Sequence, residues 1–172
     1  MKFDIIRSIF AFSILSVAAM PAQAQTWTNG LGVALPTGTP ITATGELVFT
    51  VEGFSEIETC GISVQGYVTN SNVITFYSQN PGYSCNDRFD PHFPFSLQAH
   101  VSGPLAPVKS AMAINFTIDT PLATCPPLTV PFRWYDYPQS QAKLLSTASN
   151  WCKLLPGTWL KLSGPMYGVS MN

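Results

Sequence analysis

The chain has 172 residues, of which 46% are hydrophobic and only 10% are charged, and its formal net charge is −1. Because the basic residues stand singly along the sequence, the composition argues against a nucleic-acid partner, which would need a basic stripe. A chain of this length can bury the core of one ordinary domain.

Residues 1–24 have the pattern of an export signal. Lys2 and Arg7 give a positive start, and Ile9–Met20 is apolar but short for a membrane span. Ala22-Gln23-Ala24 then supplies the small-x-small pattern of a cleavage site. We therefore expect an exported protein of the periplasm, the cell surface or the medium, with no transmembrane helix after signal cleavage. An uncleaved N-terminal anchor is the alternative.

Residues 25–40 form a Gly-, Pro- and Thr-rich segment with an apolar island at Leu31–Leu35. We interpret it as a first strand that pairs within its own domain. The alternative is an arm that adds itself to the sheet edge of another subunit. Residues 41–172 are assigned to a single β domain.

Alternation of apolar with polar or small residues marks the strands of this domain, and breakers such as Asn80-Pro81-Gly82 separate them. The predicted strands are Glu46–Val51, Ile62–Val68, Val73–Tyr77, Phe95–Val101, Met112–Ile118, Leu128–Trp134 and Trp159–Leu162. Only Gln141–Asn150 is compatible with a short helical turn. The pattern predicts an all-β fold, either an antiparallel β-sandwich or a barrel-like domain.

Two halves of the domain, about 45–104 and 109–165, echo one another. Phe-Thr-(Val/Ile) is followed by Thr-Cys in both halves, over Phe49–Cys60 and Phe116–Cys125, and each half closes on Ser-Gly-Pro. We interpret this echo as a degenerate internal duplication.

Four cysteines, Cys60, Cys85, Cys125 and Cys152, follow the predicted signal. An even number in an oxidising compartment indicates two disulfides rather than metal or redox chemistry, and none belongs to a C-x-x-C pair. The symmetry of the repeat favours Cys60–Cys85 with Cys125–Cys152. The alternative, Cys60–Cys125 with Cys85–Cys152, stays open.

Catalytic signals are weak in this sequence. Its two histidines, His92 and His100, accompany neither a Gly-x-Ser-x-Gly elbow nor a metal-type pair, so we expect a protein that is not an enzyme, with no catalytic residues and no cofactor. Asn86, Asp87 and Asp90 precede His92 closely and offer the oxygen ligands that Ca²⁺ prefers. A turn stabilised by Asn and Asp side chains explains the same residues, and we predict no metal site.

An aromatic group surrounds Arg133 and supplies the candidate ligand contacts Phe132, Trp134, Tyr135 and Tyr137. Sugar rings and apolar ligands both stack on exposed aromatic side chains. On a strand, Phe132 and Trp134 would share one face, with Arg133 and Tyr135 on the other. The alternative is that these aromatic residues fill the core.

Short motifs follow one another through most of the chain, namely Thr42-Ala43-Thr44-Gly45-x-Leu47, Cys60, Gly66-Tyr67-Val68, Cys85, Pro94-Phe95, Cys125, Trp134 and Cys152. Their order resembles that of the exported proteins called protein activator of alkane oxidation (PraB-like). The inserts Phe89–Phe95 and Arg133–Pro138 depart from this pattern. The resemblance implies a surface-associated protein linked to growth on hydrocarbons and to biofilms, with no catalytic residues to carry over.

The expected function is that of an exported, non-catalytic surface or matrix protein, associated with biofilm or hydrocarbon and self-associating. Its partners would be other copies of the chain or an apolar or glycan surface. The first alternative is a secreted binding domain for a lipid, a hydrocarbon or a glycan. The second is a small outer-membrane β-barrel.

Overall fold

The computed structural model describes residues 25–51, 57–80, 90–101, 109–120, 124–145, 152–164 and 167–172. All regular elements in these residues are strands. They are β1 (Trp27–Asn29), β2 (Pro40–Val51), β3 (Glu58–Asn70), β4 (Val73–Gln79), β5 (Asp90–Pro91), β6 (Phe95–Val101), β7 (Lys109–Phe116), β8 (Ile118–Asp119), β9 (Leu128–Tyr135), β10 (Gln141–Leu144), β11 (Cys152–Leu154), β12 (Trp159–Ser163) and β13 (Val169–Met171). The predicted signal segment lies outside the described residues.

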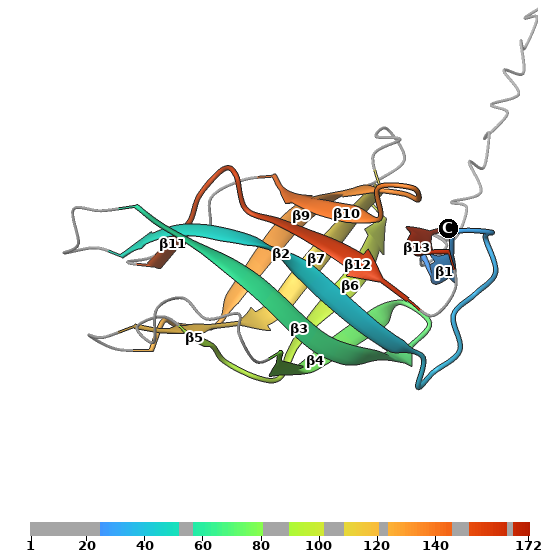
Figure 1. Ribbon diagram of the computed structural model, residues 1–172, viewed down its shortest axis with the longest axis horizontal. Coiled ribbons are helices and arrows are strands. Elements are labelled where there is room, and N and C mark those ends of the chain that lie inside the picture. The colour runs from blue at the N-terminus through green and yellow to red at the C-terminus, as the bar shows by residue number, and fades with distance from the viewer. Residues whose placement is uncertain are drawn as a thin grey trace, which may run out of the picture.

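Eight of these strands close into an up-and-down antiparallel barrel (Figure 1). Each main strand pairs with the next one along the chain, in the order β2, β3, β4, β6, β7, β9, β10 and β12, and β12 returns to β2. The long β2 serves two partners on one edge, because Thr42–Glu46 pairs with β12 and Phe49–Val51 pairs with β11. The all-β prediction is confirmed, in its barrel form.

The alternation of side chains along each strand explains why the sheet closes. On β2, Ile41, Ala43 and Leu47 are buried, while Thr42 and Thr44 are only half-buried on the outside. An eight-stranded barrel has an interior just wide enough for side chains to fill, and here they form one hydrophobic cluster. Each large apolar side chain buried there stabilises the fold by about 1.5–3 kcal/mol.

Glycine permits the closest strand contact at the seam of the barrel. A Cβ atom on Gly45 would lie only 2.0 Å from the carbonyl oxygen of Trp159, on the neighbouring strand β12. Residue 45 takes an inward position of β2, where any side chain would push the two strands apart. The glycine in the Thr-Gly-Glu sequence of β2 therefore allows β12 to approach closely enough to close the barrel.

The two predicted halves contribute equally to the barrel. Residues 45–104 include most of β2 and all of β3, β4 and β6, and residues 109–165 include β7, β9, β10 and β12. A duplicated four-stranded unit would give this division, although the duplication itself stays a prediction.

A helical turn was considered for residues 141–150, and it is wrong for the described residues 141–145. Gln141–Leu144 is β10, whose pairing with β9 and β12 overrides a locally ambiguous sequence.

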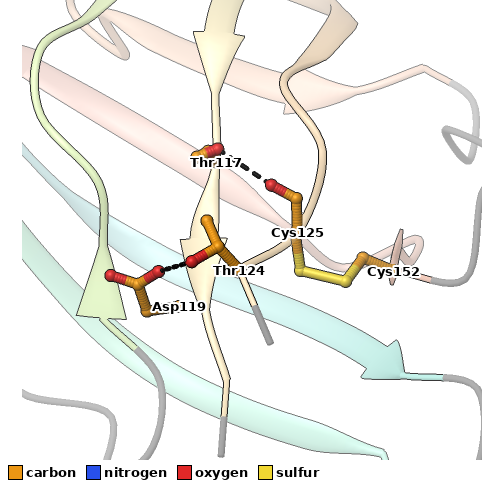
Figure 2. The surroundings of a disulfide bond; sticks show 5 residues. All are labelled: Thr117, Asp119, Thr124, Cys125 and Cys152. Atoms are coloured by element: carbon orange, nitrogen blue, oxygen red, sulfur yellow. Dashed lines mark hydrogen bonds between the residues drawn. A yellow bond between two sulfur atoms is a disulfide. The ribbon is translucent and has the colours of Figure 1, made fainter. Parts of the chain in front are cut away.

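A disulfide joins Cys125 to Cys152, with the two Cα atoms 5.9 Å apart and both residues buried (Figure 2). Thr117 Oγ1 donates a hydrogen bond of 3.1 Å to the carbonyl oxygen of Cys125. This pairing excludes the alternative that crosses the two halves. Cys60 is also disulfide-bonded, but its predicted partner Cys85 lies outside the described residues, so one disulfide is seen where two are expected.

The first and last strands pair with each other at one end of the barrel (Figure 1). We call β1 and β13 together the terminal ribbon. Trp27 is opposite Met171 and Asn29 is opposite Val169. The strand expected in residues 25–40 is thus docked within its own chain, in agreement with the first interpretation. No helix in the described part of the chain is long and apolar enough to cross a bilayer.

Candidate functional site

The terminal ribbon inserts apolar side chains into the end of the barrel. Trp27, Val169 and Met171 are fully buried. The Trp27 ring meets the Trp134 ring edge to face, with centroids 5.1 Å apart, and its Nε1 donates a hydrogen bond of 3.0 Å to the Asn72 carbonyl oxygen. Such edge-to-face contacts add to the energy of burial. The ribbon is therefore a packed part of the barrel core.

Asp136, just after β9, holds the ribbon with its carboxylate. Oδ1 accepts hydrogen bonds from Trp134 Nε1 at 2.8 Å and from the Met171 backbone N–H at 2.9 Å. Oδ2 pairs with Lys109 Nζ, which also donates to the Met171 carbonyl oxygen. Hydrogen bonds to a charged group are among the stronger ones in proteins. This side chain joins the barrel wall, the tryptophan pair and the C-terminal strand.

Four large apolar or aromatic side chains are exposed around the terminal ribbon, and we call them the apolar end face. They are Leu31 (69% exposed), Val33 (61%), Tyr167 (60%) and Tyr137 (49%). Asn29 supports the loop that carries the first two, because its Oδ1 accepts both the Leu31 and Val33 N–H groups at 3.0 Å.

Close packing at Gly30 brings the parts of the apolar end face together. A Cβ atom there would lie 2.0 Å from the Tyr167 carbonyl oxygen and 2.9 Å from the Tyr137 ring. The Asn172 side-chain amide also donates to the Gly32 carbonyl oxygen, at 3.3 Å. The loop that begins at Gly30 thus lies against both tyrosine segments, which places the four exposed side chains at the same end of the barrel.

The structure divides the predicted ligand contacts between core and surface. Phe132 and Trp134 are 2% and 4% exposed and belong to the core, so neither presents an exposed ring on which a ligand could stack. Arg133 is exposed and Tyr135 is half-buried on the outer face, which confirms the predicted alternation. Only Tyr135 and Tyr137 stay available as surface contacts, because the barrel interior takes every second residue of β9.

A shallow depression of about 490 Å³ lies beside these tyrosines on the outside of the barrel. Its lining consists of polar, charged and aromatic side chains and has no aliphatic one. The lining residues are Lys109, Arg133, Trp134, Tyr135, Asp136, Tyr137 and Gln139. Arg133 Cζ lies 5.6 Å from the centroid of the Tyr135 ring. An open depression of this kind suits a ligand that lies along the surface.

The described residues of the acidic cluster around His92 contact other residues of the chain. His92 Nε2 lies 2.8 Å from Asp119 Oδ2, and Asp119 Oδ1 accepts a hydrogen bond of 2.5 Å from Thr124 Oγ1. The backbone of Asp90 pairs with Asp119 between β5 and β8. Asn86 and Asp87 lie outside the described residues. The histidine is therefore paired with Asp119, whose hydrogen bond with Thr124 lies beside the disulfide (Figure 2).

Sequence reasoning missed the roles of Asp136 and Lys109. The two residues are 27 positions apart, and nothing local marks them as partners. A weak signal existed in the Trp-Tyr-Asp sequence at the end of a predicted strand, where a carboxylate can accept a tryptophan N–H. The exposed Leu31 and Val33 did fall inside the predicted apolar island.

Comparison with known proteins identifies one family. A family model described as "Alkane oxidation protein activator PraA/PraB-like" matches residues 2–160. No curated protein and no solved structure matches the chain.

Proposed function

Because the chain belongs to the PraA/PraB-like family of alkane oxidation activators, we propose that it is an exported, non-catalytic protein that binds apolar liquid or solid surfaces through its apolar end face. The observation that carries the proposal is the gathering of Leu31, Val33, Tyr137 and Tyr167 around the terminal ribbon. Contiguous exposed apolar groups on a soluble-type core mark contact sites. Alkanes are insoluble in water, so activation of their oxidation calls for contact with an oil surface.

Two features support export. Residues 1–24 have the pattern of a cleavable signal. The Cys125–Cys152 disulfide fits an oxidising compartment, since such bonds are rare in the cytosol. A location in the periplasm, at the cell surface or in a biofilm matrix agrees with both features.

The barrel interior argues against two alternatives, a lipid carrier with an open cavity inside the barrel and an outer-membrane barrel with a polar interior. A lipid carrier of this type needs a cavity inside the barrel, whereas here the Phe95 ring packs against Phe76 and Phe116 in the core, at centroid distances of 5.1 Å. An outer-membrane barrel needs an apolar outer band and a polar interior. On β3 the reverse holds, with Ile62 and Val64 buried and Gln65 exposed.

The sequence also predicts self-association, and the fold favours it less than contact with an apolar surface. Closure of the barrel removes the open edges of its main strands, which are the usual route to assembly by strand addition. The terminal segment that offered itself as an arm is paired within the chain. Contact between copies would have to use side-chain surfaces instead.

The test compares variants inside and outside the apolar end face. Leu31→Ser/Val33→Ser removes two apolar groups from that face, whereas Ile57→Ser/Leu145→Ser removes two exposed apolar groups elsewhere on the barrel. Each side chain withdrawn from water is worth about 1.5 kcal/mol or more, so the first variant should bind hexadecane droplets at least about tenfold more weakly. Binding is read by sedimentation of the droplets and by oil–water interfacial tension.

The control variant, Ile57→Ser/Leu145→Ser, should bind droplets as the unchanged protein does. Equal weakening by both pairs of substitutions would show non-specific adsorption and refute the proposal. So would an unchanged protein that leaves the interfacial tension unaltered.

A further inference from the structure

The outer wall formed by β9, β10 and β12 gathers side chains that are far apart in sequence. Pairing places Arg133 opposite Lys143 and Lys143 opposite Trp159, and in the next row Tyr135 opposite Gln141 and Gln141 opposite Lys161. All six point outward, because their neighbours on each strand are buried. We call these six residues the cation–aromatic patch.

The three cations of the patch form no ion pair with a described carboxylate, and the carboxylate that borders the patch, Glu46, instead accepts a hydrogen bond of 3.2 Å from Trp159 Nε1. Arg133, Lys143 and Lys161 are exposed, and the ion pairs found among the described residues join other groups, His92 with Asp119 and Lys109 with Asp136. Lys143 Nζ lies 5.4 Å from the centroid of the Tyr135 ring, and the Arg133 guanidinium contacts the same ring. Like charges opposite one another destabilise a sheet. The contacts with the Tyr135 ring offset part of this repulsion, and an anionic ligand bound at the patch would offset more of it.

Two shallow depressions extend the patch at either side. The one of about 490 Å³ includes Arg133 and Tyr135. The other, of about 260 Å³, includes Lys143 and Trp159 together with Gly157. Neighbouring strands are about 4.8 Å apart, and alternate residues on one strand are about 6.8 Å apart. The patch is thus a track with charges and rings at close intervals, which fits a chain-like ligand better than a compact one.

We propose that the cation–aromatic patch binds an acidic polysaccharide, in which carboxylates recur along a chain of sugar rings. The rings stack on Tyr135 and Trp159, and the carboxylates pair with Arg133, Lys143 and Lys161. Gln141 lies between them and offers its amide to sugar hydroxyls. The patch shares no residue with the apolar end face, although Tyr137 of that face also lines the adjoining depression. This binding goes beyond the proposed function and does not depend on it.

Polysaccharide fits better than the other polyanions. Binding to nucleic acid depends on many phosphate contacts, whereas this patch has three cations on a chain whose formal net charge is −1. An anionic bilayer would favour large apolar groups that insert between lipids. Tyr135 and Trp159 are instead half-buried and bordered by shallow depressions.

The experiment measures binding of the signal-free protein to polygalacturonate by titration calorimetry. Neutralisation of the patch in Arg133→Gln/Lys143→Gln/Lys161→Gln should weaken binding by about tenfold or more, at a few-fold per exposed ion pair. Lys153→Gln, an exposed charge on β11 outside the patch, is the matched control and should bind as the unchanged protein does. Fully methyl-esterified polygalacturonate, which lacks the carboxylates, should bind about as weakly to the unchanged protein as the acid form binds to the triple variant.

Single-stranded DNA and phosphatidylglycerol vesicles form two further arms of the experiment. Tighter binding to either of them than to polygalacturonate would overturn the proposal. So would equal weakening by Lys153→Gln and by the triple variant, or no binding of polygalacturonate by the unchanged protein. Trp159→Leu keeps all charges and should still weaken binding of the acid form several-fold. Its thermal midpoint verifies that it folds, and unchanged binding by the folded variant would contradict stacking.

Discussion

The two ends of the barrel are closed in different ways. At one end the terminal ribbon is held by burial of Trp27 and by the hydrogen bonds and ion pair of Asp136. At the other end a covalent bond ties Cys125, just before β9, to Cys152 at the start of β11. The ribbon end also carries the apolar end face, whose loop is placed by non-covalent contacts of Asn29 and Gly30.

Trp27→Ala gives the largest expected effect and tests the ribbon end. Trp27 is fully buried and its indole N–H is hydrogen-bonded, so truncation should cost about 3–5 kcal/mol of unfolding free energy. Urea denaturation measures the loss. Leu31→Ala, on the exposed loop beside it, should change stability by less than about 0.5 kcal/mol. A loss below about 1 kcal/mol for Trp27→Ala would mean that the ribbon is not part of the core.

Removal of the disulfide tests the opposite end. The bond closes a loop with a sequence separation of 27 residues, so Cys125→Ser/Cys152→Ser should cost about 3.5 kcal/mol in the chain-entropy estimate. The same denaturation assay applies, with Lys153→Gln as the control on β11. If the double variant were as stable as the control, the covalent tie would contribute nothing and the contrast between the two ends would fail.

Asp136→Ala has the smallest expected effect and separates the ribbon from the rest of the barrel. The carboxylate is partly exposed, and loss of its bonds to Trp134, Lys109 and Met171 should cost about 2 kcal/mol. Amide hydrogen exchange should accelerate at Met171 before it changes at Val64 in the wall. Uniform acceleration at both amides would indicate that the ribbon and the wall open together.

Much of the barrel could be predicted from the sequence, because alternation is a local signal. Strands such as Leu128–Trp134 lie within one or two residues of their observed bounds. The choice between sandwich and barrel could not be made, since it depends on β12 returning to β2, a contact between residues more than a hundred positions apart. The strand Gln141–Leu144 was missed for the same reason: it is held by partners on both sides rather than by its own pattern.

The candidate sites were predictable only in part. The sequence predicted the aromatic group of β9 as a whole. In the barrel its members point to opposite sides of the sheet, so Phe132 is buried in the core and Tyr135 lies on the outer surface. Basic residues that stand singly in the sequence, such as Arg133 and Lys143, become neighbours by strand register. Register follows from the hydrophobic pattern of the whole sheet, and single segments do not reveal it.

The central claim is that the ribbon end of the barrel contacts apolar surfaces. The most direct measurement is hydroxyl-radical footprinting of tyrosines on protein adsorbed to hexadecane droplets. Tyr137 and Tyr167 belong to the apolar end face, and Tyr67 and Tyr77 are similarly exposed on β3 and β4. The account predicts that the first pair becomes protected on the droplets while the second pair stays reactive. Equal protection of all four, or protection of Tyr67 and Tyr77 alone, would contradict it.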